Sequence, residues 1–447
     1  MKESEKIQKQ NDGKVGVRAR KNNKLYTEPY KGVRDFYPAD MAVQNYIFGK
    51  MRKTVESFGY VEYGASILEP TELYEAKSGE ELVKEQTYSF KDRGDRSVTL
   101  RPEMTPTLAR MIAGKKRELS FPLRWYSIPN AFRYERPQRG RAREHWQLNV
   151  DLFGGNEINA DAEIISLACQ ILKDIGAKDS DFEIRVNYAG MFTEFLSMEF
   201  GLNKDDGIKL IKIYDKSGKG KIPEEEIDKK LEEIIGKENI IKLKELNKDS
   251  EKMNEKLKDD KNLRYLINLK DKLSELNINI KVDPFLTRGF DYYTGMVFEV
   301  YDTNPENNRS MFGGGRYDNL LEIFDAEKIP AVGFGMGDVP VRNFLEVRNL
   351  IPEYVSTTNL MLCALSKENT KYAQDLATRL REQGLNVAVD LSNKKIGDQI
   401  KIADKQNIPF VICIGTDEEK TGKFKLKKLK TGNEEEVSEE EIKKLIF

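Results

Sequence analysis

The sequence of 447 residues contains one histidine, three cysteines and no long apolar run. So few histidine and cysteine ligands nearly exclude a Cys/His zinc site, and we expect no metal site in the protein. Cys169, Cys363 and Cys413 each lie in an apolar segment, so we expect reduced thiols in the core. No stretch approaches the roughly twenty apolar residues of a membrane-spanning helix. The start, MKESEKIQKQNDGK, lacks a secretory apolar stretch and carries acidic residues, which predicts a cytoplasmic protein that binds no membrane.

An excess of either charge is also missing, because 74 Lys and Arg residues are matched by 75 Asp and Glu residues. A balanced total argues against a protein that wraps nucleic acid over its whole surface, but it allows local basic patches. The length predicts two or three domains.

The pattern along the chain predicts its organisation. Residues 1–30 are polar and Lys-rich, which is typical of a mobile extension. Residues 31–350 predict an α+β domain on a mainly antiparallel sheet, because hairpins join its strands. Within that domain, about 200–280 show Lys, Glu, Ile and Leu at helical spacing, which predicts a helical insertion. Residues 356–447 alternate strands and helices, which predicts a separate α/β domain with a parallel sheet.

Three finer predictions concern single elements. Residues 60–70 are expected to form one strand that ends at Pro70. A helix is expected after Ser366, with that residue as its N-cap and Gly384 just past its end. The lysine-rich segment 423–430 is expected either to meet RNA phosphates or to form an edge strand protected by lysine.

The most distinctive segment is residues 132–154, FRYERPQRGRAREHWQLNVDLFG. Five arginines fall within eleven residues, between apolar runs that predict the two arms of an antiparallel hairpin. Guanidinium groups bind phosphate in a planar, bidentate geometry, so this hairpin fits a polyphosphate, an RNA end, or both. A solvated surface would also hold such a charge run, although the strand–turn–strand setting favours a site.

Five motifs follow one another along the chain: LRPEMT, FRYERPQRGR, TRGFDYYTG, GGGRYD and AVGFGMG. In this order they resemble the class II aminoacyl-tRNA synthetases and, within them, the histidyl-tRNA synthetase family. The resemblance extends from Gly32 to the C-terminus. It implies a histidine–tRNA ligase that converts L-histidine and ATP, with accompanying Mg²⁺, to histidyl-adenylate. The histidyl group then passes to the 3′ end of tRNA(His).

The resemblance also implies roles for residues that meet ATP. Arg133 and Arg288 would be the catalytic pair on either side of the α-phosphate, stabilise charge in the transition state and also contact histidine. Glu135 would lie near the adenine amino group. The flat ring of His145 would stack on adenine, with an unrelated structural histidine as the alternative.

The remaining implied roles concern the amino acid. Glu103, Thr105 and Gln147 would accept the substrate ammonium, with Met104 where the family often has a small residue. Asp151 and Tyr293 would bind the two imidazole nitrogens, with Tyr292 either alongside them or simply part of the core. The histidine-binding residues are thus expected to be Glu103, Met104, Thr105, Arg133, Gln147, Asp151, Arg288, Tyr292 and Tyr293.

Further partners follow from the same resemblance. Arg136, Gln138, Arg139 and Arg141 would contact the tRNA acceptor end, and the C-terminal domain would bind the anticodon. Residues 41–70 match the segment through which class II synthetases form homodimers. One departure stands out: the family's usual arginine for the ATP γ-phosphate is replaced by Pro340, and Arg342 lies about 200° further round the helix.

Three other functions compete with this interpretation. A non-catalytic regulatory paralogue from histidine biosynthesis shares the fold, but such proteins lack the C-terminal domain and parts of TRGFDYYTG. A class II enzyme for proline or threonine would not carry TRGFDYY and GGGRYD. A simple RNA-binding module would have no use for Glu103, Gln147 and Asp151 beside an ATP-type hairpin.

Overall fold

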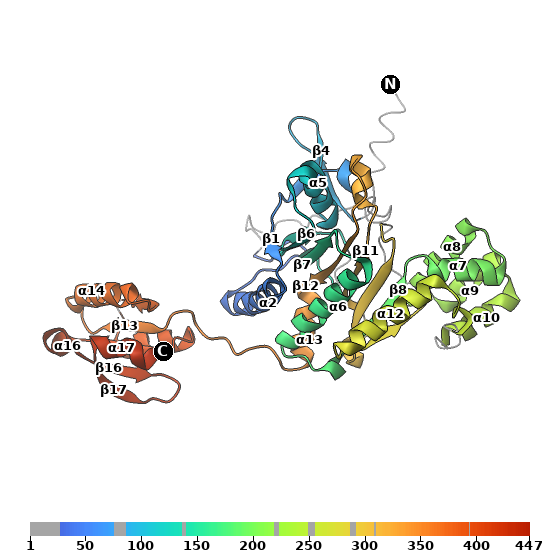
Figure 1. Cartoon of the computed structure of the whole chain (residues 1–447). Helices are drawn as coiled ribbons and strands as arrows, with labels where there is room; N and C mark the ends of the chain where they lie inside the picture. The colour runs from blue at the N-terminus through green and yellow to red at the C-terminus, as the bar shows by residue number, and fades with distance from the viewer. Residues whose placement is uncertain are drawn as a thin grey trace, which may run out of the picture. The chain divides into compact units, whose positions relative to one another are not determined.

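The computed structural model describes residues 27–75, 86–135, 140–218, 223–248, 255–286, 292–307, 310–392 and 394–447. These residues form two compact units, one made mainly of residues 44–350 and the other mainly of residues 351–447 (Figure 1). The first unit combines a large sheet with helices and the second is a smaller α/β unit, which confirms the predicted fold class.

The main sheet of the first unit contains nine strands among the described residues. Their order is β1-β5-β7-β12-β11-β10-β8-β9, and β6 pairs with β7. The outer pairs β1–β5 and β8–β9 are parallel and the others are antiparallel, as predicted for a mainly antiparallel sheet. The strands are β1 Val61–Glu62, β5 Leu123–Ser127, β6 Asn130–Phe132, β7 Glu144–Phe153, β8 Phe182–Tyr188, β9 Ile280–Val282, β10 Met296–Asp302, β11 Ser310–Arg316 and β12 Ala331–Gly337.

A second, three-stranded sheet in the same unit has the order β2-β4-β3 and is antiparallel. Its strands are β2 Leu68–Pro70, β3 Tyr88–Lys91 and β4 Ser97–Leu100. The prediction of one strand over residues 60–70 was therefore wrong, because β1 and β2 belong to different sheets. Between β1 and β2, two backbone carbonyls bind a side chain. The Arg101 guanidinium donates to the carbonyls of Ala65 at 3.0 Å and Ser66 at 3.2 Å.

Helices pack against the main sheet and one another (Figure 1). Helices α6 and α13 contact β7 and β12, and α12 contacts α6, β8 and β9. A buried ion pair joins α6 to the sheet, since Arg316 on β11 lies 2.5 Å from the Asp161 carboxylate. Tyr265 on α12 donates to the same carboxylate at 2.8 Å. The helices are α2 Pro38–Ser57, α3 Glu72–Glu75, α5 Thr105–Lys115, α6 Glu157–Asp174, α12 Lys261–Glu275 and α13 Asp338–Val347.

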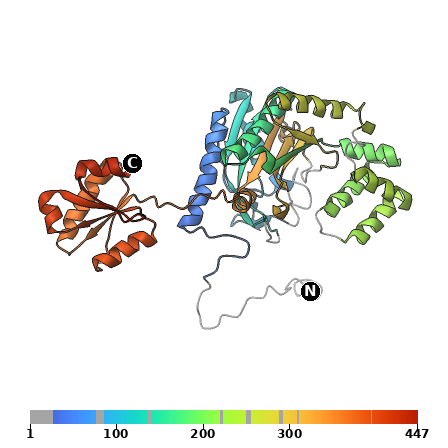
Figure 2. The ribbon, with the colours of Figure 1, turned by 90° about the horizontal axis from the view of Figure 1, so that it is seen from below.

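A group of helices lies beside the sheet, and most of them fall in the stretch of about 200–280 that was predicted to be helical (Figures 1 and 2). These are α7 Met191–Phe200, α8 Lys204–Gly218, α9 Glu224–Ile235 and α10 Lys237–Lys248. They are amphipathic, and α9 buries Ile227, Leu231 and Ile235 on one side. Helix α12 falls in the same sequence stretch but packs on the sheet instead.

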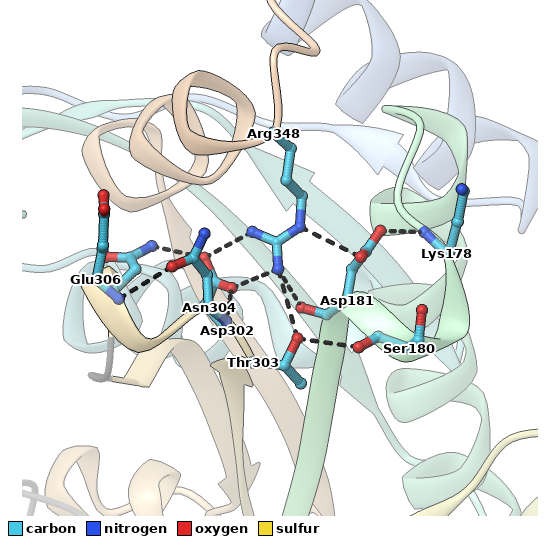
Figure 3. A network of polar contacts seen from close by, with 9 residues as sticks. Lys178, Ser180, Asp181, Asp302, Thr303, Asn304, Glu306 and Arg348 are labelled. Atoms are coloured by element: carbon cyan, nitrogen blue, oxygen red, sulfur yellow. Dashed lines mark hydrogen bonds and ion pairs between the residues drawn. The ribbon is translucent and has the colours of Figure 1, made fainter.

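A polar network fixes the end of the first unit, where α13 stops (Figure 3). Arg348 donates to both carboxylate oxygens of Asp302 at 2.6 and 2.9 Å and to the carbonyl of Asp181 at 2.9 Å. The Asp302 carboxylate is fully buried, so the guanidinium neutralises a charge that water does not reach. The network thereby ties the end of β10 to the turn before β8.

The second unit holds a five-stranded sheet with the order β14-β13-β15-β16-β17. The first three strands are parallel, as predicted, and the last two complete an antiparallel hairpin. Its strands are β13 Leu360–Ala364, β14 Val387–Val389, β15 Phe410–Ile414, β16 Lys423–Lys428 and β17 Glu434–Ser438. Its helices are α14 Asn369–Glu382, α15 Ile396–Lys405, α16 Thr416–Thr421 and α17 Glu439–Ile446.

One finer prediction for this unit was wrong, and one of the two alternatives for the lysine-rich segment is ruled out. Helix α14 begins at Asn369, and the Ser366 hydroxyl donates to the Asn369 side chain at 2.9 Å instead of capping the backbone. Strand β16 is not an edge strand, because it pairs with β15 and β17. Its Lys427 lies 2.8 Å from Glu434 on β17, so part of its charge is matched within the sheet. Gly384 does follow the end of α14, with the positive φ of 92° that favours glycine.

Candidate active site

One face of β7, β12 and β11 carries the predicted site residues His145, Gln147 and Asp151, because side chains alternate along a strand. The register pairs Asp151 with Gly333 and Gln147 with Gly337, so these residues lie on the same face. The other face carries apolar residues and Arg316, which reaches α6. The glycines on the site face are Gly313, Gly315, Gly333, Gly335 and Gly337.

Three of these glycines leave space for site residues. A Cβ atom at Gly333 would overlap with the carboxylate of Asp151, and one at Gly335 would overlap with the Gln147 amide. A Cβ at Gly315 would lie 2.9 Å from the Tyr293 ring. The side chains of Asp151 and Gln147 therefore lie directly on the backbone of β12.

Asp151 is buried at the centre of this face. The Tyr317 hydroxyl donates to its Oδ1 atom, whereas Oδ2 has no partner among the described residues. Burial raises the pKa of the Asp151 carboxyl to about 7, and the bond from Tyr317 opposes that rise. This carboxyl can therefore gain or lose a proton near neutral pH while one oxygen stays available to a ligand.

The lone histidine lies further along the same strand. Burial lowers the pKa of His145 to about 3, and the guanidinium groups of Arg133 and Arg34 add to the effect. The ring is therefore neutral at physiological pH, and its flat face can stack on a heterocycle. Next on this face, Gln147 donates to the Asn149 side chain at 2.8 Å.

A chain of contacts links Asp151 to the start of α5. The Tyr292 hydroxyl donates to the Glu103 carboxylate at 3.1 Å. The rings of Tyr292 and Tyr317 are 5.8 Å apart in an edge-to-face arrangement, and Tyr317 bonds Asp151. Thr105 is half-buried at the first position of α5, but the Met104 side chain is 1% exposed and belongs to the core. The site thus has a buried carboxylate at each end and two tyrosines between them.

The arginine hairpin begins beside this array. Arg133 donates from Nε to the Pro102 carbonyl at 2.9 Å, next to Glu103. Glu135 is paired with Arg141 at 2.9 Å. Arg143 is buried, and its guanidinium lies 4.0 Å from the centre of the Tyr134 ring. The hairpin arms β5 and β7 pair as predicted. Arg136, Gln138, Arg139 and Arg288 lie outside the described residues.

Near Pro340, where the family usually has an arginine for the ATP γ-phosphate, other residues form a polar cluster. Asp338, the first residue of α13, is buried and accepts from the Trp146 backbone N–H at 3.0 Å. Arg34, far away in the sequence, donates to the same carboxylate at 2.7 Å. Arg342 pairs with Glu346 on its own helix at 3.0 Å. The Asp338 carboxylate therefore holds the Arg34 guanidinium at the end of β12.

Sequence reasoning missed Tyr317, Gly333 and Gly335. All three lie within motifs that were recognised, GGGRYD and AVGFGMG. The signal was the alternation of side chains along a strand. Arg316 faces α6, so Tyr317, one residue on, faces the site.

A family model described as "Histidyl-tRNA synthetase" matches residues 32–338, and one described as "Anticodon binding domain" matches residues 359–446. The chain belongs to the histidyl-tRNA synthetase family. A histidine–tRNA ligase of Leptospira biflexa is 41% identical over 421 residues, which cover 93% of this chain and 96% of the relative. A histidine–tRNA ligase of Pyrococcus horikoshii is 36% identical over 432 residues, which cover 93% of this chain and 97% of the relative.

Solved structures of this family have the same fold. Histidyl-tRNA synthetase from Nostoc sp. PCC 7120 aligns with a TM-score of 0.78 at 24% identity, covering 94% of this chain and all of that one. A Bacillus halodurans protein described as an ATP phosphoribosyltransferase regulatory subunit/histidyl-tRNA synthetase aligns with a TM-score of 0.68 at 23% identity, covering 88% and 99%. Within the described part of the present chain, no helix is both long and apolar enough to cross a bilayer.

Proposed function

We propose that this histidyl-tRNA synthetase family member activates L-histidine with ATP and transfers the histidyl group to tRNA(His). The observation that carries the proposal is the array with Glu103 at one end and Asp151 at the other, joined through Tyr292 and Tyr317. Histidine carries an ammonium group at one end and ring nitrogens at the other, so its two ends fit these two carboxyls.

The amino-acid site is proposed to work as follows. Glu103, Thr105 and Gln147 accept the ammonium protons, while Oδ2 of Asp151 accepts an N–H of the imidazole ring. Tyr293 meets the other ring edge, with Tyr292 holding Glu103 in place. Met104 contributes its backbone position only, since its side chain is in the core. An analogue without a ring nitrogen would leave Asp151 unpaired and would bind poorly.

ATP is proposed to bind at the hairpin. Arg133 and Arg288 stabilise the charge that builds on the α-phosphate during attack by the histidine carboxylate. Adenine stacks on the neutral His145 ring, and Glu135 binds its amino group. Mg²⁺ enters with ATP, because phosphate oxygens are among its preferred ligands. Arg34 offers a guanidinium where Pro340 cannot, since Asp338 holds it at the end of β12.

The partners are proposed from family membership. Arg136, Gln138, Arg139 and Arg141 meet the tRNA acceptor end, and the 356–447 domain binds the anticodon, as the anticodon-binding model at 359–446 suggests. The protein acts in the cytoplasm as a homodimer through residues 41–70. Val61 and Leu68 in this stretch are 57% and 43% exposed, which supports an apolar contact there. Equilibrium sedimentation of Val61→Glu against the wild type tests the dimer.

The decisive experiment is ATP–pyrophosphate exchange with each of the twenty amino acids. We expect exchange with histidine alone, followed by charging of tRNA(His). Arg288→Ala and Arg133→Ala should each nearly abolish exchange without unfolding the protein, as checked by circular dichroism. Exchange that persists in Arg288→Ala contradicts the proposed mechanism. Silence of the wild type with every amino acid favours the regulatory paralogue.

A further inference from the structure

Three buried polar atoms lie on the site face of the main sheet, and two of them have no role so far. They are the hydroxyl oxygens of Tyr63 and Ser127 and the Oδ2 atom of Asp151. Oδ2 of Asp151 has no hydrogen-bond partner among the residues that the structure describes, and the two hydroxyls have none outside their own pair. Buried polar side-chain atoms are nearly always fully hydrogen-bonded in folded proteins, so unused hydrogen-bonding capacity at three neighbouring atoms on one face indicates a ligand or ordered water.

The strand register brings these groups together. Trp125 on β5 lies opposite Asp151 on β7, and Ser127 lies opposite Asn149. Residues directly opposite each other share a face, so the Ser127 and Asp151 side chains lie on the same face. Tyr63 follows β1, and its backbone N–H donates to the Tyr126 carbonyl at 2.9 Å, beside Ser127. Its ring centre is 5.7 Å from that of Trp125.

Electrostatic influence and packing confirm that the three groups are neighbours. Burial raises the pKa of the Tyr63 hydroxyl, the nearby Asp151 carboxylate raises it further, and a hydrogen bond with the Ser127 hydroxyl opposes the change. The rings of Tyr63 and Trp125 pack in the same cluster as those of Tyr292, Tyr293 and Tyr317. Tyr63 and Ser127 therefore border the array already described, at its Asp151 end.

We infer that Tyr63 and Ser127 are specificity-determining residues whose hydroxyls lie with Oδ2 of Asp151 around one nitrogen of the substrate's heteroaromatic ring and help to supply its hydrogen-bond partner. This inference rests on the proposed function, which supplies the ring. Each hydroxyl both donates and accepts, so the pair satisfies a ring nitrogen whether or not it carries a proton. The hydroxyls reach the nitrogen directly or through one water that the three groups hold.

The test compares ligands that differ only in the ring. Calorimetric titration measures binding of L-histidine and of β-(2-thienyl)-L-alanine, which has no ring nitrogen, to the wild type, Tyr63→Phe and Ser127→Ala. We expect each variant to bind histidine about tenfold more weakly and to bind the thienyl analogue as the wild type does. Pyrophosphate exchange should show the same rise in KM for histidine, with KM for ATP unchanged.

Tyr60→Phe is the matched control, because it also removes a buried hydroxyl, one that donates to Glu163 at 3.0 Å. It should lower stability and leave the preference for histidine over the analogue intact. Wild-type affinity and preference in both site variants overturn the inference, as does a wild type that binds no histidine. Variant-dependent histidine binding without any exchange sustains the inference while contradicting the proposed catalytic activity.

Discussion

The two faces of β7, β12 and β11 are built from different residues, although every strand contributes to both. The face toward α6 and α13 carries Leu148, Val150, Val332, Phe334 and Met336, all buried. The opposite face carries glycines and the buried Asp151 carboxylate, whose Oδ2 atom has no partner among the described residues. One face thus stabilises the fold, and the other leaves hydrogen-bonding capacity for a ligand.

This difference shows how a stable sheet can contain an active site. Alternation along a strand lets adjacent residues take separate tasks without a break in the backbone ladder. Arg316 and Tyr317 illustrate this, since one bonds Asp161 on α6 and the other bonds Asp151 in the site. Substitutions on the face toward α6 and α13 should change stability, and those on the site face should change catalysis.

The largest expected effect is on the helix-facing side. Arg316→Met leaves the buried Asp161 carboxylate without its ion pair, which costs about 3–5 kcal/mol of unfolding free energy. Urea denaturation followed by circular dichroism measures the loss. The affinity for histidine in the surviving folded fraction should stay close to that of the wild type. A variant as stable as the wild type would remove the stabilising role assigned to this face.

The next effect is on the site face. Gly335→Ala places a methyl group where the Gln147 amide lies, so that amide must move. A displacement of about 1 Å costs about 100-fold in kcat/KM for histidine activation. Met336→Ala, the neighbouring residue on the other face, is the control. It should lose about 2–5 kcal/mol of stability without a rise in KM, and equal behaviour of the two variants contradicts the division of tasks.

Tyr317→Phe should have a smaller effect on the same face. It removes the donor to Asp151 Oδ1, so KM for histidine should rise roughly tenfold while stability changes little. Because the Tyr317 bond lowers the pKa of Asp151, its loss should move that pKa above about 7. The pH profile of KM for histidine should therefore shift to higher pH, and an unshifted profile contradicts the role of the bond.

The smallest expected effect concerns the lone histidine. Its folded-state pKa of about 3 lies below the unfolded value, so the unfolded chain takes up the proton first as pH falls. The stability contributed by neutral His145 is complete above about pH 6.5 and is lost as pH falls towards 3. Arg34→Met should raise this pKa, which NMR titration of the single ring resonance detects, and should raise KM for ATP. Arg110→Met, whose guanidinium pairs with Glu69, is the control.

Much of the architecture could be predicted from local pattern. The hairpin arms around the arginine run, the helices of the 200–280 stretch and the parallel strands of the second unit follow hydrophobic periodicity and turn residues. The break between β1 and β2 could not be predicted, because it depends on Arg101, which is distant in the sequence and binds the intervening carbonyls. Ser366 was misassigned since its hydroxyl finds Asn369.

The candidate site was predictable where motifs carry the residues, as for Glu103, Gln147 and Asp151. Tyr63, Ser127 and Arg34 could not be found that way. In the sequence, Tyr63 and Ser127 look like ordinary strand residues. Only the pairing of β5 with β7 and with β1 places their hydroxyls beside Asp151. Arg34 lies about 300 residues from its partner Asp338.

The glycines of β12 and β11 set a limit on how this site can change. Its floor is main chain at Gly333 and Gly335, where no side chain remains to be shortened. Any substitution there adds atoms and makes the space smaller. A descendant enzyme could therefore accept a bulkier amino acid only by trimming the opposing residues of β7, β5 and α5, so mutational routes to a new substrate are confined to those elements.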